Sequence, residues 1–254
     1  MTAIDTRDDS DLYCVHAVPA SRPFVWLSRG LDDMLKHPFA SLAYGAMVAV
    51  LGMLVMAYAH HPFFLAAVTT GFLLVGPVMT AGLCELSRRH DIGLEASFGS
   101  SLQVLSKQRP ALLRFASILF AFAALWFTLS VGMLQAMTGD AAPSLASTVW
   151  GDVLRQLSGT QIQVYLGIGA ILAAVVFSLS VVTVPMIVDR HVSARTAMHM
   201  SLKATQRDLP AMLLWAALIV ALVAVGFASN LLGMLVIFPL LGHSAWYAYR
   251  DLVD

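Results

Sequence analysis

Six long apolar runs constrain this chain more than any other feature of its sequence. A helix needs about 20 apolar residues to cross the hydrocarbon core of a bilayer. The six runs cover residues 39–58, 63–86, 111–137, 164–188, 211–228 and 231–249. Lipid cannot satisfy free backbone N–H and C=O groups, so a chain with such runs crosses the bilayer as helices. We expect an all-α, polytopic membrane helix bundle with six transmembrane helices.

The content of charged residues supports the same class. Only 12% of the residues are charged, about half of the share in a soluble domain. Asn230 separates the last two runs and predicts a tight turn there. A single helix over residues 211–249 would be about 58 Å long at 1.5 Å per residue, which is too long for one span.

The basic residues are placed on one side of the runs. Of the 15 Lys and Arg residues, all except Arg155 lie in the N-terminal tail, after the second, fourth and sixth runs, or just inside the third. The positive-inside rule then predicts that both termini are cytoplasmic, as an even number of spans requires. The N-terminal residues lack the basic and apolar regions of a cleaved signal, so the first span is expected to direct insertion. We expect residues 1–21 to form a disordered polar tail and residues 22–254 one six-span membrane domain, with an outer loop at about 138–161.

The sequence also suggests a threefold internal repeat. Each cytoplasmic segment has apolar residues spaced three and four apart, such as Phe24, Leu27, Leu31 and Met34, which predicts one apolar helical face. Each segment ends at a proline that suits the first turn of the next helix, namely Pro38, Pro110 and Pro210. We predict three units, each an interfacial helix followed by a transmembrane hairpin.

The second run of each pair carries its own proline. These residues are Pro77, Pro185 and Pro239, and a proline within a span kinks the helix. Three such kinks either serve packing alone or line a central cavity. For a pathway, the candidate positions are Pro77, Thr80, Thr183, Pro185, Pro239 and His243.

No motif in the sequence predicts catalysis, a cofactor or a metal. A glycine-rich phosphate loop, a zinc-protease helix and a nucleophile elbow are all missing from the sequence. Of the eight histidines only His243 lies within a run, whereas haem ligation in a bundle needs facing residues. We expect His243 to bond to a neighbouring helix, Glu85 to pair with Arg88 or Arg89, and Cys14 and Cys84 to be free thiols.

Four segments carry a resemblance to a known family. They are WLSRGLDDMLKHPFASLAYG, GFLLVGPVMTAGLCELSRR, SVVTVPMIVDRHVSARTAM and PLLGHSAWYAYRDLV. Over residues 24–253 the chain resembles a bacterial family of uncharacterised six-span integral membrane proteins, catalogued as a domain of unknown function. Some members carry the label of a cytochrome c oxidase subunit. The resemblance implies the bacterial cytoplasmic membrane and supplies no catalytic residues.

These observations favour a non-enzymatic accessory or structural membrane component. The resemblance implies an association with a respiratory oxidase. The expected partners are membrane lipids and other integral membrane proteins, without nucleic acid. The alternative is a transporter of a small solute or lipid. A transporter predicts that Pro77, Pro185 and Pro239 converge on a wettable polar cleft, whereas an accessory protein predicts a dry centre and an apolar lateral face.

Overall fold

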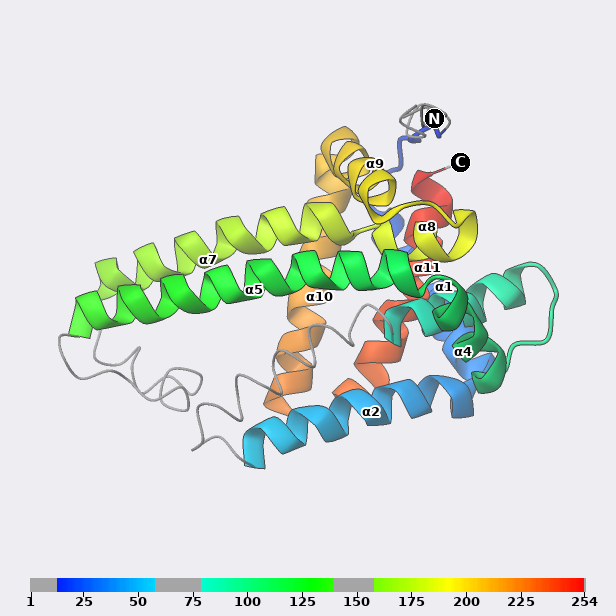
Figure 1. Ribbon diagram of the computed structural model, residues 1–254, viewed down its shortest axis with the longest axis horizontal. Coiled ribbons are helices and arrows are strands. Elements are labelled where there is room, and N and C mark those ends of the chain that lie inside the picture. Colours follow the sequence, from blue (N-terminus) through cyan, green and yellow to red (C-terminus); the bar gives the residue numbers. More distant parts are fainter. Residues whose placement is uncertain (1–12, 58–78, 139–157, 254) are drawn as a thin grey trace, which may run out of the picture.

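Helices make up almost all of the structure. The computed structural model describes residues 13–57, 79–138 and 158–253. The helices are α1 (Arg22–Lys36), α2 (Pro38–Ala57), helix 79–91, α4 (Phe98–Lys107), α5 (Arg109–Thr138), α7 (Gly159–Ser180), α8 (Thr183–Arg190), α9 (Ala194–Arg207), α10 (Leu209–Ala228) and α11 (Met234–Leu252). The all-α prediction is therefore confirmed for the described residues (Figure 1).

Among the described residues, three helical stretches are long and apolar enough to cross a membrane. They are Arg109–Met137, Gly159–Arg190 and Leu209–Ala228, and they coincide with the third, fourth and fifth predicted runs. The pair α1–α2 gives a fourth if this pair, bent by 107°, is one span. The described part of helix 79–91 includes the end of the second run, most of which lies outside the described residues. Helix α11 has the length of a span, but its second half carries His243, Arg250 and Asp251.

Three short helices each precede a long helix at a proline. Helix α2 begins at Pro38, and the second residues of α5 and α10 are Pro110 and Pro210. A proline is tolerated there because the first N–H groups of a helix have no partner within the helix. The predicted boundaries at these prolines therefore match the helix starts.

The prolines within the runs have different effects on their helices. Helix α7 ends at Ser180 and α8 starts at Thr183, with a turn between them. Pro185 lies four residues after Val181 and cannot donate to its carbonyl, which explains the interruption at that turn. Pro239 lies inside α11, which remains helical around it. Pro77 lies outside the described residues.

Helix α11 is packed between α1 and α2. A Cβ atom on Gly30 of α1 would lie 2.8 Å from the backbone nitrogen of Ser244, and one on Gly45 of α2 would overlap the carbonyl of Leu235. Glycine at these positions therefore allows the helix backbones to approach closely. The hairpin of α5 and α7, in contrast, projects away from this core (Figure 1).

The two ends of the described chain meet. Val15 and Val253 form an isolated antiparallel bridge, and the N–H of His16 donates to the carbonyl of Leu252 at 2.9 Å. The N–H of Val18 donates to Asp208 Oδ2 at 3.1 Å. The extended residues before α1 are thus held against the end of α11.

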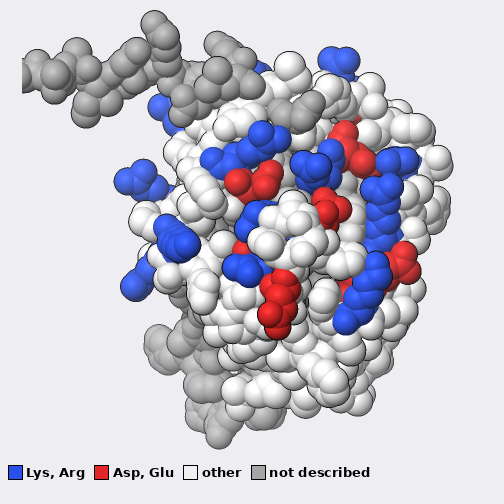
Figure 2. Space-filling model, turned by 90° about the vertical axis from the view of Figure 1, so that its right-hand side faces the viewer, with Lys and Arg blue, Asp and Glu red and all other residues white. Residues whose placement is uncertain are grey.

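Charged residues gather at one end of the molecule, where helix 79–91, α8 and α11 end. Figure 2 shows Lys, Arg, Asp and Glu intermixed on this face, which we call the charged end. Arg250 Nε lies 3.6 Å from Asp91 Oδ2, and Tyr249 donates to Asp189 Oδ2 at 2.7 Å. These contacts join the three helix ends to one another.

Candidate functional site

A buried polar junction lies where α11 meets α2 and helix 79–91. Its centre is the imidazole of His243. The side chains of His243, Ser41 and Ser87 are all fully buried. The Ser41 Oγ lies 2.9 Å from His243 Nε2, and the Ser87 Oγ lies 2.7 Å from His243 Nδ1. One imidazole therefore connects three helices that are distant in sequence.

The hydrogen bonds of Ser41 determine the tautomer of His243. The Ser41 hydroxyl donates its single hydrogen to the carbonyl of His37 at 2.8 Å. It must therefore accept from Nε2, which carries the proton, and Nδ1 accepts from the hydroxyl of Ser87. Both ring nitrogens are satisfied in the neutral form, as a buried histidine requires.

A second polar cluster lies closer to the charged end. Asp33 on α1 is 1% exposed and accepts a hydrogen bond from Tyr247 on α11 at 2.9 Å. Its Oδ1 also lies 2.8 Å from His90 Nδ1, although the two groups are not aligned as a hydrogen bond. Lys36 Nζ lies 3.2 Å from His90 Nε2.

His37 lies at the bend between α1 and α2 and contacts this cluster. Its ring meets that of His90 edge-on, with 5.7 Å between centroids. Burial lowers the pKa of His37 below its ordinary value, and the nearby His90 and Lys36 lower it further, against the opposite effect of Asp33. Protonation of His37 is therefore disfavoured in the folded state.

Glu85 forms the third polar contact, with the arginines predicted from the sequence. Its carboxylate accepts two hydrogen bonds from Arg88, at 2.7 and 3.0 Å, and one from Arg89 at 2.8 Å. The sequence predicted that Glu85 pairs with Arg88 or Arg89, and the structure shows that it pairs with both. The Glu85 side chain is 1% exposed and each arginine side chain is 23% exposed, so a buried carboxylate pairs with two partly exposed arginines.

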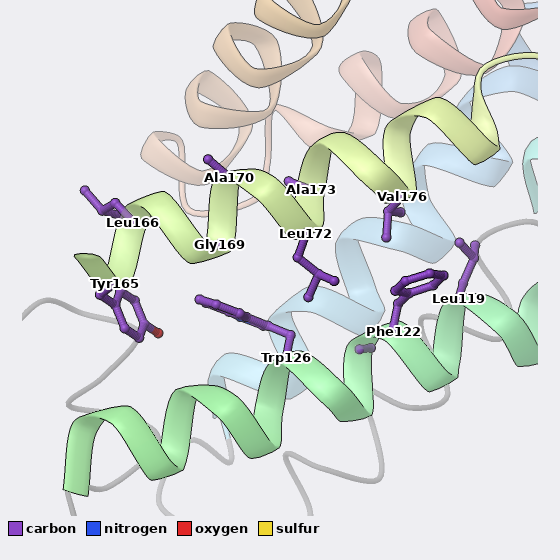
Figure 3. Close-up of a pocket in the computed structure, with 11 residues that line it drawn as sticks. Leu119, Phe122, Trp126, Tyr165, Leu166, Gly169, Ala170, Leu172, Ala173 and Val176 are labelled. Atoms are coloured by element: carbon purple, nitrogen blue, oxygen red, sulfur yellow. The ribbon is translucent and has the colours of Figure 1, made fainter. Parts of the chain in front are cut away.

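An apolar groove lies between α5 and α7, far from these polar clusters. It encloses about 490 Å³ and is lined by Leu119, Phe122, Ala123, Trp126, Tyr165, Leu166, Gly169, Ala170, Leu172, Ala173 and Val176. Figure 3 shows Trp126 reaching from α5 toward α7 beside Tyr165. The two rings are 5.2 Å apart, and Tyr165 also bonds to Ser130 at 2.7 Å.

The predicted pathway residues lie in different surroundings. Thr183 and Pro185 are buried in and near α8, where Thr183 donates to the Leu179 carbonyl of the preceding turn. Pro239 is buried in α11, and Thr80 is half-buried in helix 79–91. His243 bonds to a neighbouring helix, as expected, and its partners are Ser41 and Ser87.

Sequence reasoning did not identify Asp33, Ser41 or Ser87 as partners. A signal existed only for Asp33, which lies on the same helical face of α1 as the buried Trp26 and Gly30. Within the described ranges, no group of three or more His, Cys, Asp or Glu side chains is placed to hold a metal ion. The arrangement provides buried hydrogen bonds between helices, which stabilise helix association in a membrane.

Comparisons with known proteins support the membrane assignment. Residues 64–189 match the model of a family described as "Predicted integral membrane protein (DUF2189)". No curated protein matches this chain significantly. No solved structure does so either.

Proposed function

Since residues 64–189 match the model of a family of predicted integral membrane proteins of unknown function, we propose that the chain is a non-enzymatic accessory component of the bacterial inner membrane. In this role it binds a transmembrane helix of another membrane protein in the groove between α5 and α7. The proposal includes six spans in three repeated units, with both termini in the cytoplasm.

The groove is the observation that carries this proposal. No residue of α7 is buried along Gly159–Ser180, so this helix makes one-sided contacts within the chain. The groove follows the helical hairpin, and Ala123, Gly169, Ala170 and Ala173 in its lining have small side chains. Small residues allow the backbone of another helix to come close, which drives association where lipid provides no hydrophobic force.

The topology rests on charge and on helix order. A short helix precedes each of α2, α5 and α10, which carry a proline at their first or second residue, as three repeated units require. The charged side chains lie at the end opposite the α5–α7 hairpin (Figures 1 and 2). The excess of Lys and Arg at this end favours the cytoplasm. A respiratory oxidase is the partner that the sequence resemblance favours.

Transport of a small solute or lipid is the second candidate. It is favoured by the buried imidazole of His243, since polar groups within a membrane often mark a pathway. Transport also requires a wettable route that reaches this side chain, and both hydrogen-bonding nitrogens of the ring are already engaged by Ser41 and Ser87.

Photo-crosslinking in the native membrane tests the proposal. A benzoylphenylalanine at Leu166, within the groove, is expected to crosslink to a membrane protein that mass spectrometry identifies. Ala173→Trp fills the groove and should abolish that crosslink. Val220→Trp is the matched control, because Val220 is 68% exposed on α10 and does not line the groove.

The same preparation distinguishes the two candidates. Co-purified oxidase subunits with a haem absorbance spectrum would identify the partner as a respiratory complex. Crosslinks to lipid alone would contradict helix binding. Flux of a solute into vesicles that contain only this protein, lost in His243→Phe but not in Ala173→Trp, would establish transport instead.

A further inference from the structure

Helix α1 has three distinct faces rather than the two of a simple amphipathic helix. Successive residues turn by about 100° in a helix, so Phe24, Leu31 and Leu35 lie within an arc of about 40°. All three are exposed, at 55%, 42% and 65%. An exposed stripe of this kind is unusual beside so many charged groups.

The two other faces of α1 have different neighbours. Pro23, Trp26, Gly30, Asp33 and Met34 are buried within the protein. The exposed polar residues Arg29, Asp32 and Lys36 lie on the next face round the helix, and the exposed Ser28 lies at the edge of the apolar stripe. The sequence pattern grouped Met34 with Phe24 and Leu31, but the structure assigns Met34 to the protein face.

The apolar stripe continues beyond the bend at His37. Phe39, in the first turn of α2, is 90% exposed. Helix α2 then continues as an apolar helix with further exposed residues at Met47, Val50, Met53 and Leu54. The stripe on α1 is therefore continuous with the outer surface of a helix that belongs to a predicted membrane span.

Resting on the proposed topology, in which α1 is the interfacial helix of the first unit, we infer that α1 lies in the surface of the bilayer at the charged end with Phe24, Leu31 and Leu35 inserted among the lipid acyl chains. A helix with one face in lipid and a charged face in water lies in the interface, with its apolar face about 5–10 Å inside the headgroup boundary. Arg29 and Lys36 lie on the adjoining polar face, where the Arg29 guanidinium lies over the ring of Tyr247 and Lys36 Nζ lies beside His90.

This arrangement accounts for the 107° bend between α1 and α2. A helix in the membrane plane must turn by roughly a right angle to enter the bilayer. Arg22 Nε and Trp26 Nε1 both donate to Asp251 Oδ2, at 2.6 and 2.7 Å. These bonds anchor the N-terminal end of α1 to the charged end, so the depth of α1 also defines where the membrane surface lies on this protein.

Site-directed fluorescence quenching tests the inference. Single cysteines are placed at Leu31 and Leu35, and at Asp32 and Lys36 as matched controls on the polar face. All are made in a Cys14→Ser background, because Cys84 is fully buried. Each variant is labelled with an NBD fluorophore and reconstituted in phosphatidylcholine and phosphatidylglycerol vesicles. The quenchers are aqueous iodide and lipids with a doxyl group near the headgroup.

The doxyl lipid should quench Leu31→Cys and Leu35→Cys more strongly than iodide does. The order should reverse at Asp32→Cys and Lys36→Cys. Strong iodide quenching at all four positions would show that α1 stands in water and overturn the inference. Protection of Leu31→Cys and Leu35→Cys from both quenchers would also overturn it, because protein would then cover this face.

Discussion

The imidazole Nδ1 of His243 lies 2.7 Å from the hydroxyl oxygen of Ser87, although 156 residues separate them in sequence. Both side chains are completely buried. This contact links α11, which carries Pro239, to helix 79–91. On the other side of the ring, Ser41 links the imidazole to α2. The junction is thus a structural bond among three helices.

Replacement of His243 by Phe should destabilise the protein. The hydroxyl of Ser87 would lose its acceptor and Ser41 would lose a donor, each within a dry environment. An unsatisfied buried polar group costs about 1–3 kcal/mol, so we expect a loss of about 2 kcal/mol or more. Thermal unfolding in mild detergent measures this. His16→Phe is the control, because His16 is exposed and lies outside the helices; equal losses in both variants would contradict a special role for the junction.

Replacement by alanine should lower stability at Gly45, which lies at a close helix contact, and raise it at Gly132, which does not. Gly45→Ala places a methyl group against the backbone of Leu235, and such overpacking costs about 1–3 kcal/mol. A Cβ at Gly132 in α5 meets no atom within 4 Å, so Gly132→Ala should stabilise the helix by about 0.5–1 kcal/mol. Unfolding measurements on the two variants should therefore differ in sign.

Asp251 should make stability depend on pH in the acid range. Burial opposes ionisation of Asp251, but the hydrogen bonds from Arg22 and Trp26 outweigh it and lower its pKa below the ordinary value. The folded state then binds fewer protons than the unfolded state, so the stabilisation is complete above the ordinary pKa of about 3.9. It is lost as the pH falls through the folded pKa.

Asp251→Asn should remove this acid dependence and lower stability at neutral pH by about 1 kcal/mol, since the Arg22 side chain is partly solvated. The free energy of unfolding of the wild type and of the variant, measured at a series of values from about pH 3 to pH 7, gives the difference. An unchanged acid profile in the variant would show that other carboxylates dominate.

His37 should make stability depend on pH in a higher range than Asp251 does. Its pKa is lowered mainly by burial, so the unfolded state binds more protons just below the ordinary histidine pKa of about 6.5. The contribution of neutral His37 is complete above this pH and is lost as the pH falls. His37→Gln should flatten the stability profile between about pH 5 and pH 7. Identical profiles for wild type and His37→Gln would exclude this role.

The Ser130–Tyr165 bond should contribute little by itself. It is a side-chain hydrogen bond between α5 and α7, and such bonds in membrane bundles average about 0.6 kcal/mol in double-mutant cycles. Ser130→Ala, Tyr165→Phe and the double variant complete the cycle. A coupling energy near zero would indicate that the ring contact of Tyr165 with Trp126 carries the interaction instead.

The sequence by itself determined the helical class, the apolar stretches at 111–137, 164–188 and 211–228, and the helix starts at Pro38, Pro110 and Pro210. These features follow from local properties, because the number of consecutive apolar residues and the missing N–H of proline act within a few residues of their positions. The pairing of Glu85 with Arg88 and Arg89 was accessible for the same reason, since three and four residues make one helical turn.

Only the tertiary structure decided which helices meet and which faces they use. Ser41 and Ser87 became partners of His243, and Asp33 turned toward Tyr247, through the rotation and register of helices far apart in the chain. Met34 and Leu31 belong to one apolar pattern in the sequence, yet one is buried in protein and the other is exposed. Hydrophobic periodicity shows which face of a helix is apolar. Lipid chains and the protein interior are equally apolar, so only the packing of the helices decides which of the two that face contacts.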